Sequence, residues 1–160
     1  PVELEVDAPA WMEVAAVEVD LRLNGESCSE FRFYAYACAE LGVPVAFLSG
    51  DAGICAEARR LVPGITTVAT HEGRGSATVS LQPLRAARLI EEGVLRAVSR
   101  GFGDCHVELP RHFTLEIRFR DHQAAYFRSF FPGVRLVDSK TIAFESDRFE
   151  DIRVAVHFIA

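Results

Sequence analysis

The sequence predicts an α/β fold: a mixed, largely parallel sheet flanked by helices, with an α+β C-terminal part. In the first two thirds of the chain, short apolar or alternating runs take turns with amphipathic segments, as in βαβ units with parallel strands. Residues 113–160 follow the order β-α-β-β-α, which is typical of α+β proteins. A chain of 160 residues with 49% hydrophobic residues can bury a sizeable core, so we expect a single domain over residues 1–160.

The overall charge and the hydropathy exclude several classes of partner. A net charge of −6 argues against nucleic acid or an anionic membrane as the main partner. The longest apolar runs are too short to span a bilayer. The sequence has neither a signal-peptide pattern nor a C-x-x-C pair among its four cysteines. We therefore expect a reduced, cytoplasmic protein without a zinc site of that type, although disulfides stay open.

The first elements are expected to be strands that lead into a turn. Residues 2–6 alternate between apolar and charged side chains, as an edge strand would. Residues 14–23 form a second run whose last half alternates cleanly. This run ends at Asn24-Gly25, which is a strong turn sequence.

A helix is expected over residues 28–41. Ser27 and Glu30 make the S-x-x-E pattern of a capping box at its start. Gly42 is at the position where a glycine in the left-handed conformation would end the helix, and Pro44 prevents the helix from continuing.

The middle of the chain is expected to form two further helices and three strands. Pro83 opens the longest helix, because proline fits the first turn. The expected elements are strand 43–48, a Gly50-Asp51 loop at its carboxyl end, helix 52–61, strand 65–69, polar loop 70–76, strand 76–81 and helix 83–99. The inward stripe of the last helix would be Leu84, Ala87, Ile90, Val94 and Ala97.

The C-terminal part is expected to contain three strands and two helices. Asp121 and Asp147 precede the two helices and are the expected N-caps. The elements are strand 113–119, a helix from Asp121 to about residue 130, strands 134–137 and 141–144, and helix 148–159.

Glu30 is the residue that suggests chemistry. At about 100° per residue it shares a helix face with Tyr34, Ala37 and Leu41, so a carboxylate heads an apolar stripe. One interpretation is that Glu30 completes the capping box. The other is that it points into a cleft as a metal ligand or an acid/base, where a buried carboxylate needs a partner.

Other motifs of known chemistry are missing. No histidine pair has H-E-x-x-H spacing, and neither a P-loop, a dinucleotide fingerprint nor a G-x-S-x-G elbow occurs. Basic residues gather at Arg111, Arg118, Arg120 and Arg128, which we interpret as a solvated face rather than a phosphate track.

Four segments in order resemble the zinc-dependent D-aminopeptidase family, the self-compartmentalising enzymes associated with dipeptide transport. Their order and spacing carry the resemblance. They read LNGESCSEFRFYAYACAELGVPVAFLSGD (23–51), EARRLVPGITTVAT (57–70), SLQPLRAARLIEEG (80–93), and TLEIRF (114–119) with FFPGVRLVDSKTIAF (130–144). They match the C-terminal portion of that family.

The resemblance implies a metallohydrolase that removes N-terminal residues from short peptides. Glu30 falls on the family's zinc-ligating glutamate, and Asp51 and His71 are weaker candidates for the surroundings of that site. Zinc is then the cofactor, short peptides are the substrates, and a homo-oligomeric ring is expected. In such a site zinc lowers the pKa of a bound water, which attacks the peptide carbonyl.

The departures from the family pattern lead to two hypotheses. The family's Asp-x-Glu pair and two histidines precede the matched region, and its catalytic histidine would fall near residues 11–14, yet no histidine precedes His71. Glycine usually precedes the ligand glutamate, where this chain has Ser29. We therefore assign no catalytic residue. The chain is either a hydrolase that is incomplete or inactive alone, or a non-catalytic oligomeric scaffold or small-ligand-binding relative. A further alternative is a different small-molecule enzyme that uses the same cleft.

Overall fold

The computed structural model describes residues 20–160. The expected strand 2–6 and residues 14–19 of the next strand lie outside the described residues. The chain divides into two compact units. Unit 1 contains residues 20–27 and Arg111–Ala160, and unit 2 contains Cys28–Pro110. The expectation of a single domain stays a prediction.

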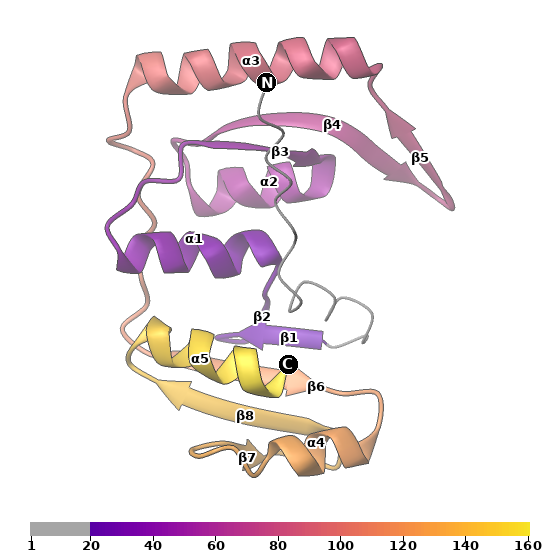
Figure 1. The fold of residues 1–160 in the computed structure, drawn as a ribbon, viewed down its shortest axis with the longest axis vertical. Coiled ribbons are helices and arrows are strands. Elements are labelled where there is room, and N and C mark those ends of the chain that lie inside the picture. The colour runs from indigo at the N-terminus through magenta and orange to yellow at the C-terminus, as the bar shows by residue number, and fades with distance from the viewer. Residues whose placement is uncertain (1–19) are drawn as a thin grey trace, which may run out of the picture. The chain divides into compact units, whose positions relative to one another are not determined.

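Unit 2 is a three-stranded sheet with helices on both sides. Its strand order is β3-β4-β5, in which β3 and β4 are parallel and β4 and β5 antiparallel. Figure 1 shows α3 on one side of this sheet and α2 on the other, with α1 packed against α2. The elements are α1 (Glu30–Glu40), β3 (Phe47–Asp51), α2 (Ala52–Leu61), β4 (Thr66–Arg74), β5 (Ala77–Ser80) and α3 (Pro83–Arg100).

The ends of α1 and α3 follow from local sequence. Gly42 has φ +68°, and its N–H donates to the Ala39 carbonyl at 3.0 Å. The Val43 N–H donates to the Cys38 carbonyl at 2.8 Å, which completes a Schellman motif. Pro83 opens α3 as expected, and the side chain of Gln82 caps it.

Glycine permits close packing at two positions of unit 2. A Cβ at Gly93 would lie 2.7 Å from Phe47 Cε2, so its absence lets α3 lie directly on the sheet. A Cβ at Gly64 would lie 2.2 Å from the Asp104 carbonyl oxygen, where the two backbones meet. Buried Cys105 donates its thiol to the Gly64 carbonyl at 3.3 Å and closes this junction.

Unit 1 is a five-stranded antiparallel sheet with order β2-β1-β6-β8-β7. Helix α5 packs against β6 and β8, and α4 packs against β8. The elements are β1 (Asp20–Leu23), β2 (Glu26–Ser27), β6 (Phe113–Arg118), α4 (His122–Arg128), β7 (Arg135–Leu136), β8 (Thr141–Ser146) and α5 (Phe149–Ile159).

The register of this sheet separates an apolar face from a charged one. Ile117 pairs with Leu21 on one side and with Ile142 on the other, so apolar side chains line up across three strands. Phe113 is the first residue of β6 and Phe149 is the first residue of α5. Their rings are in contact, with centroids 5.3 Å apart. The core of unit 1 therefore lies between the sheet and α5.

The expected largely parallel sheet is wrong for unit 1, because β6 pairs with β1 and β8 in antiparallel fashion. Among the described strands, β3 and β4 form the one parallel pair. The polar stretch 70–76 is a strand and a tight turn rather than a loop. Gly75, at φ +62°, supplies the turn and allows residues 71–74 to pair with 77–80.

Candidate functional site

Glu30 is the first residue of α1, and its side chain is exposed. The helix is capped by Ser29, whose hydroxyl accepts a hydrogen bond from the Arg32 N–H at 3.1 Å. The expected capping box of Ser27 and Glu30 is therefore wrong. Ser27 is held in β2 by its pairing with Arg22, so the chain is still extended there and the next serine takes the cap.

The helix face that Glu30 heads does not point into the core of unit 2. Tyr34 and Leu41 on this face are exposed, whereas Ala35 and Tyr36 are the buried residues of α1. Partial burial raises the pKa of Tyr34, and the charge of Glu30 raises it further. Glu30 and Tyr34 thus lie close together on an accessible surface.

An ion pair that the sequence did not suggest joins α1 to α2. Arg32 Nε lies 3.2 Å from Glu57 Oε1, and the two side chains are 15% and 16% exposed. Beside this pair, burial raises the pKa of the Cys28 thiol to about 12. Cys28 is therefore a protonated packing residue rather than a nucleophile.

Asp51 ends β3 and caps α2. Its Oδ1 accepts hydrogen bonds from the N–H groups of Ile54 at 3.0 Å and Gly53 at 2.7 Å. These hydrogen bonds, led by that of Ile54, hold the pKa of Asp51 below its usual value, and His71 acts in the same direction. Its position at the carboxyl end of a strand matches the expectation, and its Oδ1 serves the helix.

His71 lies beside Asp51 on β4, where the two residues are register partners next to a bulge. The Thr70 hydroxyl donates its single hydrogen to the Gly50 carbonyl at 3.1 Å. The 3.0 Å contact between Thr70 Oγ1 and His71 Nδ1 must then be donated by the ring. In the neutral ring, this tautomer leaves Nε2 with a lone pair that can bind a metal ion.

The described residues do not by themselves make a zinc site. The structure brings Asp51 and His71 together, but within residues 20–160 no three His, Cys, Asp or Glu side chains could hold a metal ion together. Zinc sites use three or four protein ligands in a near-tetrahedral arrangement. Glu30, Asp51 and His71 therefore do not form such a set.

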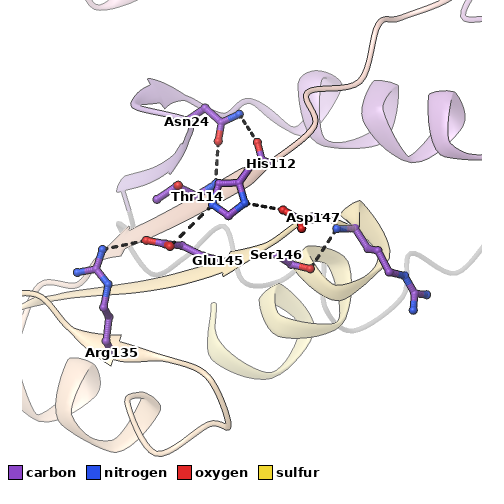
Figure 2. Close-up of polar contacts among 8 residues, drawn as sticks. Asn24, His112, Thr114, Arg135, Glu145, Ser146 and Asp147 are labelled. Carbon is purple, nitrogen blue, oxygen red and sulfur yellow. Dashed lines mark hydrogen bonds and ion pairs between the residues drawn. The ribbon is translucent and has the colours of Figure 1, made fainter.

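Unit 1 contains a polar network around His112 that the sequence did not suggest. Figure 2 shows the ring between two carboxylates, with Nδ1 2.7 Å from Asp147 Oδ1 and Nε2 3.8 Å from Glu145 Oε2. Arg135 pairs with Glu145 at 3.2 Å. Asp147 thus pairs with His112 instead of capping α5, and the expected cap is wrong because α5 has no side-chain cap.

Asn24 clamps the same end of β6. Its amide donates to the His112 carbonyl at 3.1 Å and accepts from the Thr114 N–H at 2.7 Å (Figure 2). Asn24 has φ +52°, as the Asn-Gly turn requires. The sequence indicates the Asn-Gly turn, but it does not indicate that the Asn24 side chain bonds to Thr114, which is 90 residues away.

The expected basic cluster is only partly assembled. Arg118 and Arg120 line an open hollow of about 270 Å³ together with Asp20, Phe119 and Lys140. Lys140 donates to the Arg120 carbonyl at 2.8 Å, and Asp20 pairs with Arg22 at 3.1 Å. Arg128 lies over the Phe119 ring, with Cζ 5.0 Å from its centroid.

The family of the chain follows from its agreement with known proteins. A family model described as D-aminopeptidase matches residues 14–158, which is nearly the whole sequence. The chain belongs to the D-aminopeptidase family. The resemblance inferred from the four segments is thereby confirmed.

A match in sequence and a match in structure both come from Bacillus subtilis. A D-aminopeptidase of strain 168 is 27% identical over 126 residues, covering 78% of this chain and 46% of the relative. The Zn-dependent D-aminopeptidase DppA, described as a self-compartmentalizing protease, matches in structure with a TM-score of 0.73 and 24% identity. That match covers 88% of this chain and 53% of DppA, so the chain spans about half the length of these relatives.

The match to DppA supports the mixed α/β character of the D-aminopeptidase-family fold described above. Within residues 20–160, no helix is both long enough and apolar enough to cross a membrane.

Proposed function

We propose that this member of the D-aminopeptidase family contributes Glu30 as one ligand of a zinc site and is incomplete or inactive as a peptidase on its own. The observation that carries the proposal is the family match over residues 14–158 in a chain whose described residues lack a set of three metal ligands. The remaining ligands would come from residues outside 20–160 or from another chain. Short peptides are the proposed substrates of the complete site.

The position of Glu30 supports a role as a ligand. Ser29 already caps α1, so the carboxylate of Glu30 is not needed for that purpose. Its side chain is exposed in the first turn of an 11-residue helix, where a cation can reach it. A carboxylate without a capping role can bind a cation without first leaving a capping bond.

Asp51 and His71 are proposed as neighbours of the site rather than ligands. Oδ1 of Asp51 is occupied by two backbone N–H groups, although its second oxygen can still accept a hydrogen bond. The tautomer inferred for His71 leaves Nε2 as an acceptor. The pair could therefore accept hydrogen bonds from a substrate amine and orient it.

Paramagnetic metal titration tests the role of Glu30 without depending on activity. We expect Mn²⁺ to broaden the backbone amide resonances of residues 30–34 in the wild type and to spare them in Glu30→Gln. Glu91→Gln is the matched control, because Glu91 is an exposed glutamate of another helix in the same unit. Broadening near Glu30 that is no stronger than near Glu91 would refute the ligand role.

Elemental analysis and an activity assay test whether the chain is incomplete. We expect the purified chain to contain less than stoichiometric zinc and to leave a D-alanyl p-nitroanilide intact. Stoichiometric zinc with turnover of this substrate, but not of its L-enantiomer, would show that the chain holds a whole D-specific active site.

A second candidate function is that of a non-catalytic scaffold, which binds a small ligand or supports an oligomer. The absence of three metal ligands together among residues 20–160 favours it. Mn²⁺ broadening that does not distinguish Glu30 from Glu91, in a chain that still self-associates, is the result that would select this function. Self-association is part of both candidates, and DppA is described as self-compartmentalizing. A cytoplasmic location remains a proposal.

A further inference from the structure

Unit 1 carries a group of exposed aromatic side chains on α4 and at the end of α5. Tyr126, Phe127 and Phe130 are 54%, 68% and 66% exposed. Tyr126 contacts the other two edge-on, with ring centroids 5.9 Å from Phe127 and 5.0 Å from Phe130. Phe158 is 65% exposed and stacks on Phe131, with centroids 5.8 Å apart. We call these five residues the aromatic patch.

The exposed apolar area of the aromatic patch is similar in size to the apolar area on one side of a protein interface. An aromatic side chain has about 150–250 Å² of surface, so four that are more than half exposed present roughly 500 Å². A stable interface covers about 800 Å² on each partner, of which a little over half, about 450 Å², is apolar. The patch thus supplies the apolar area that one side of a stable dimer needs.

We propose that the aromatic patch is the surface through which two copies of this chain associate. The inference rests on the self-association included in the proposed function and assigns it a surface. In a two-fold dimer the same patch faces itself, so a charge close to the axis would meet its own copy. The five patch side chains carry no charge at neutral pH, although the whole chain has a net charge of −6.

The neighbouring charge is turned away from the patch. Arg128 lies between Phe127 and Phe130 in sequence, but its guanidinium rests over the Phe119 ring at 5.0 Å. Edge-to-face aromatic pairs, like the one between Tyr126 and Phe130, can also form across a two-fold axis. The charge of Arg128 therefore does not face a second copy at the patch.

The outer face of α3 provides a matched comparison within the same chain. Leu84, Leu95 and Val98 are exposed there, so the expected inward position of Leu84 is wrong. Leu95 is 61% exposed, similar to Phe127. Its exposed apolar residues are aliphatic, and it also carries the exposed charges of Arg88 and Glu91. Leucine and valine are under-represented among interface hot spots, so we expect this face to stay outside the dimer.

Sedimentation velocity over a range of concentrations tests the proposal on the wild type, Phe127→Glu and the control Leu95→Glu. We expect the wild type and Leu95→Glu to dimerise with the same dissociation constant. Loss of an interface hot spot weakens association about 30-fold or more, and a two-fold dimer loses it twice, so Phe127→Glu should raise the constant by roughly 1,000-fold. Circular dichroism of each variant verifies its fold.

Hydrogen exchange on the wild type tests the surface without a substitution. The amides of α4 and the end of α5 should exchange more slowly at a concentration where the dimer forms than after dilution, while α3 should not change. A monomeric wild type would refute the self-association on which the inference rests. An assembly that Phe127→Glu leaves intact, or that Leu95→Glu weakens equally, or whose protection falls on α3, would refute the patch while leaving the proposed function standing.

Discussion

Replacing Gly64 by alanine should be among the most destabilising single-methyl additions in unit 2. The added Cβ would lie 2.2 Å from the carbonyl oxygen of Asp104 and 2.5 Å from its carbonyl carbon. These are backbone atoms, so a side-chain rotation cannot relieve the contact. The two chain segments would have to separate by about 1 Å to reach an ordinary van der Waals distance.

The separation also weakens the hydrogen bonds that join these segments. The Gly64 N–H donates to the Asp104 carbonyl at 3.0 Å, and the Cys105 thiol donates to the Gly64 carbonyl at 3.3 Å. Overpacking costs about 1–3 kcal/mol, and each hydrogen bond contributes about 1 kcal/mol. The free energy of unfolding should fall by about 3–4 kcal/mol, and the melting temperature by roughly 10 °C.

Urea denaturation followed by circular dichroism measures this loss. The control is Gly73→Ala, because a Cβ at Gly73 would meet nothing within 4 Å. The control should stay within about 0.5 kcal/mol of the wild type. If Gly64→Ala unfolds at the same urea concentration as the control, the close approach of residues 64 and 104 does not limit the stability of unit 2.

Three further predictions follow from the site. Ser29→Ala should destabilise the chain by about 1 kcal/mol in the same urea assay, because Ser29 caps α1; a larger loss in Glu30→Ala would contradict this assignment. The folded-state pKa of Asp51 is lowered, so its contribution to stability is present above about pH 4 and is lost as the pH falls through the folded value. Asp51→Asn should therefore have a flatter stability profile below pH 4, and equal slopes would be the contrary result. Cys28, with a pKa of about 12 against the ordinary 9.0, should react with iodoacetamide at pH 8 about 1,000-fold more slowly than in urea, as measured by mass spectrometry; equal rates would count against its burial.

The elements best predicted from the sequence are those fixed by local signals. Helix α2 covers residues 52–61 as expected, Gly42 forms the expected left-handed cap, and Asp121 caps α4 through the Ala124 N–H at 2.8 Å. Each signal acts within a few residues, so its effect does not depend on the rest of the fold.

The partners of the strands could not be predicted in this way. The alternation in residues 113–119 indicates a half-buried strand, but it contains no information on which strands lie beside it. The choice of β1 and β8 as neighbours, both antiparallel, depends on contacts far apart in sequence. The expectation of a parallel sheet extended the pattern of the middle of the chain too far.

The sequence predicted where the candidate site residues lie in the secondary structure better than it predicted their contacts and their exposure. Glu30 lies near the start of a helix and Asp51 at the carboxyl end of a strand, as expected. The cap at Ser29 and the exposure of Tyr34 were not foreseen. Helical periodicity identifies which residues share a face, not which face is buried. Burial of α1 is decided by its packing against α2, including the Arg32–Glu57 pair.

The division of unit 1 between two distant segments has a consequence for biosynthesis. Asn24 and its hydrogen-bonding partner Thr114 are separated by 90 residues, all of unit 2 among them. At about 5–20 residues per second, β1 leaves the ribosome roughly 5–18 seconds before β6 can join it. During that interval the nascent chain holds an edge strand without its main neighbour. The alternating Asp20 and Arg22 and the short hairpin with β2 are features that discourage such a strand from pairing with other nascent chains.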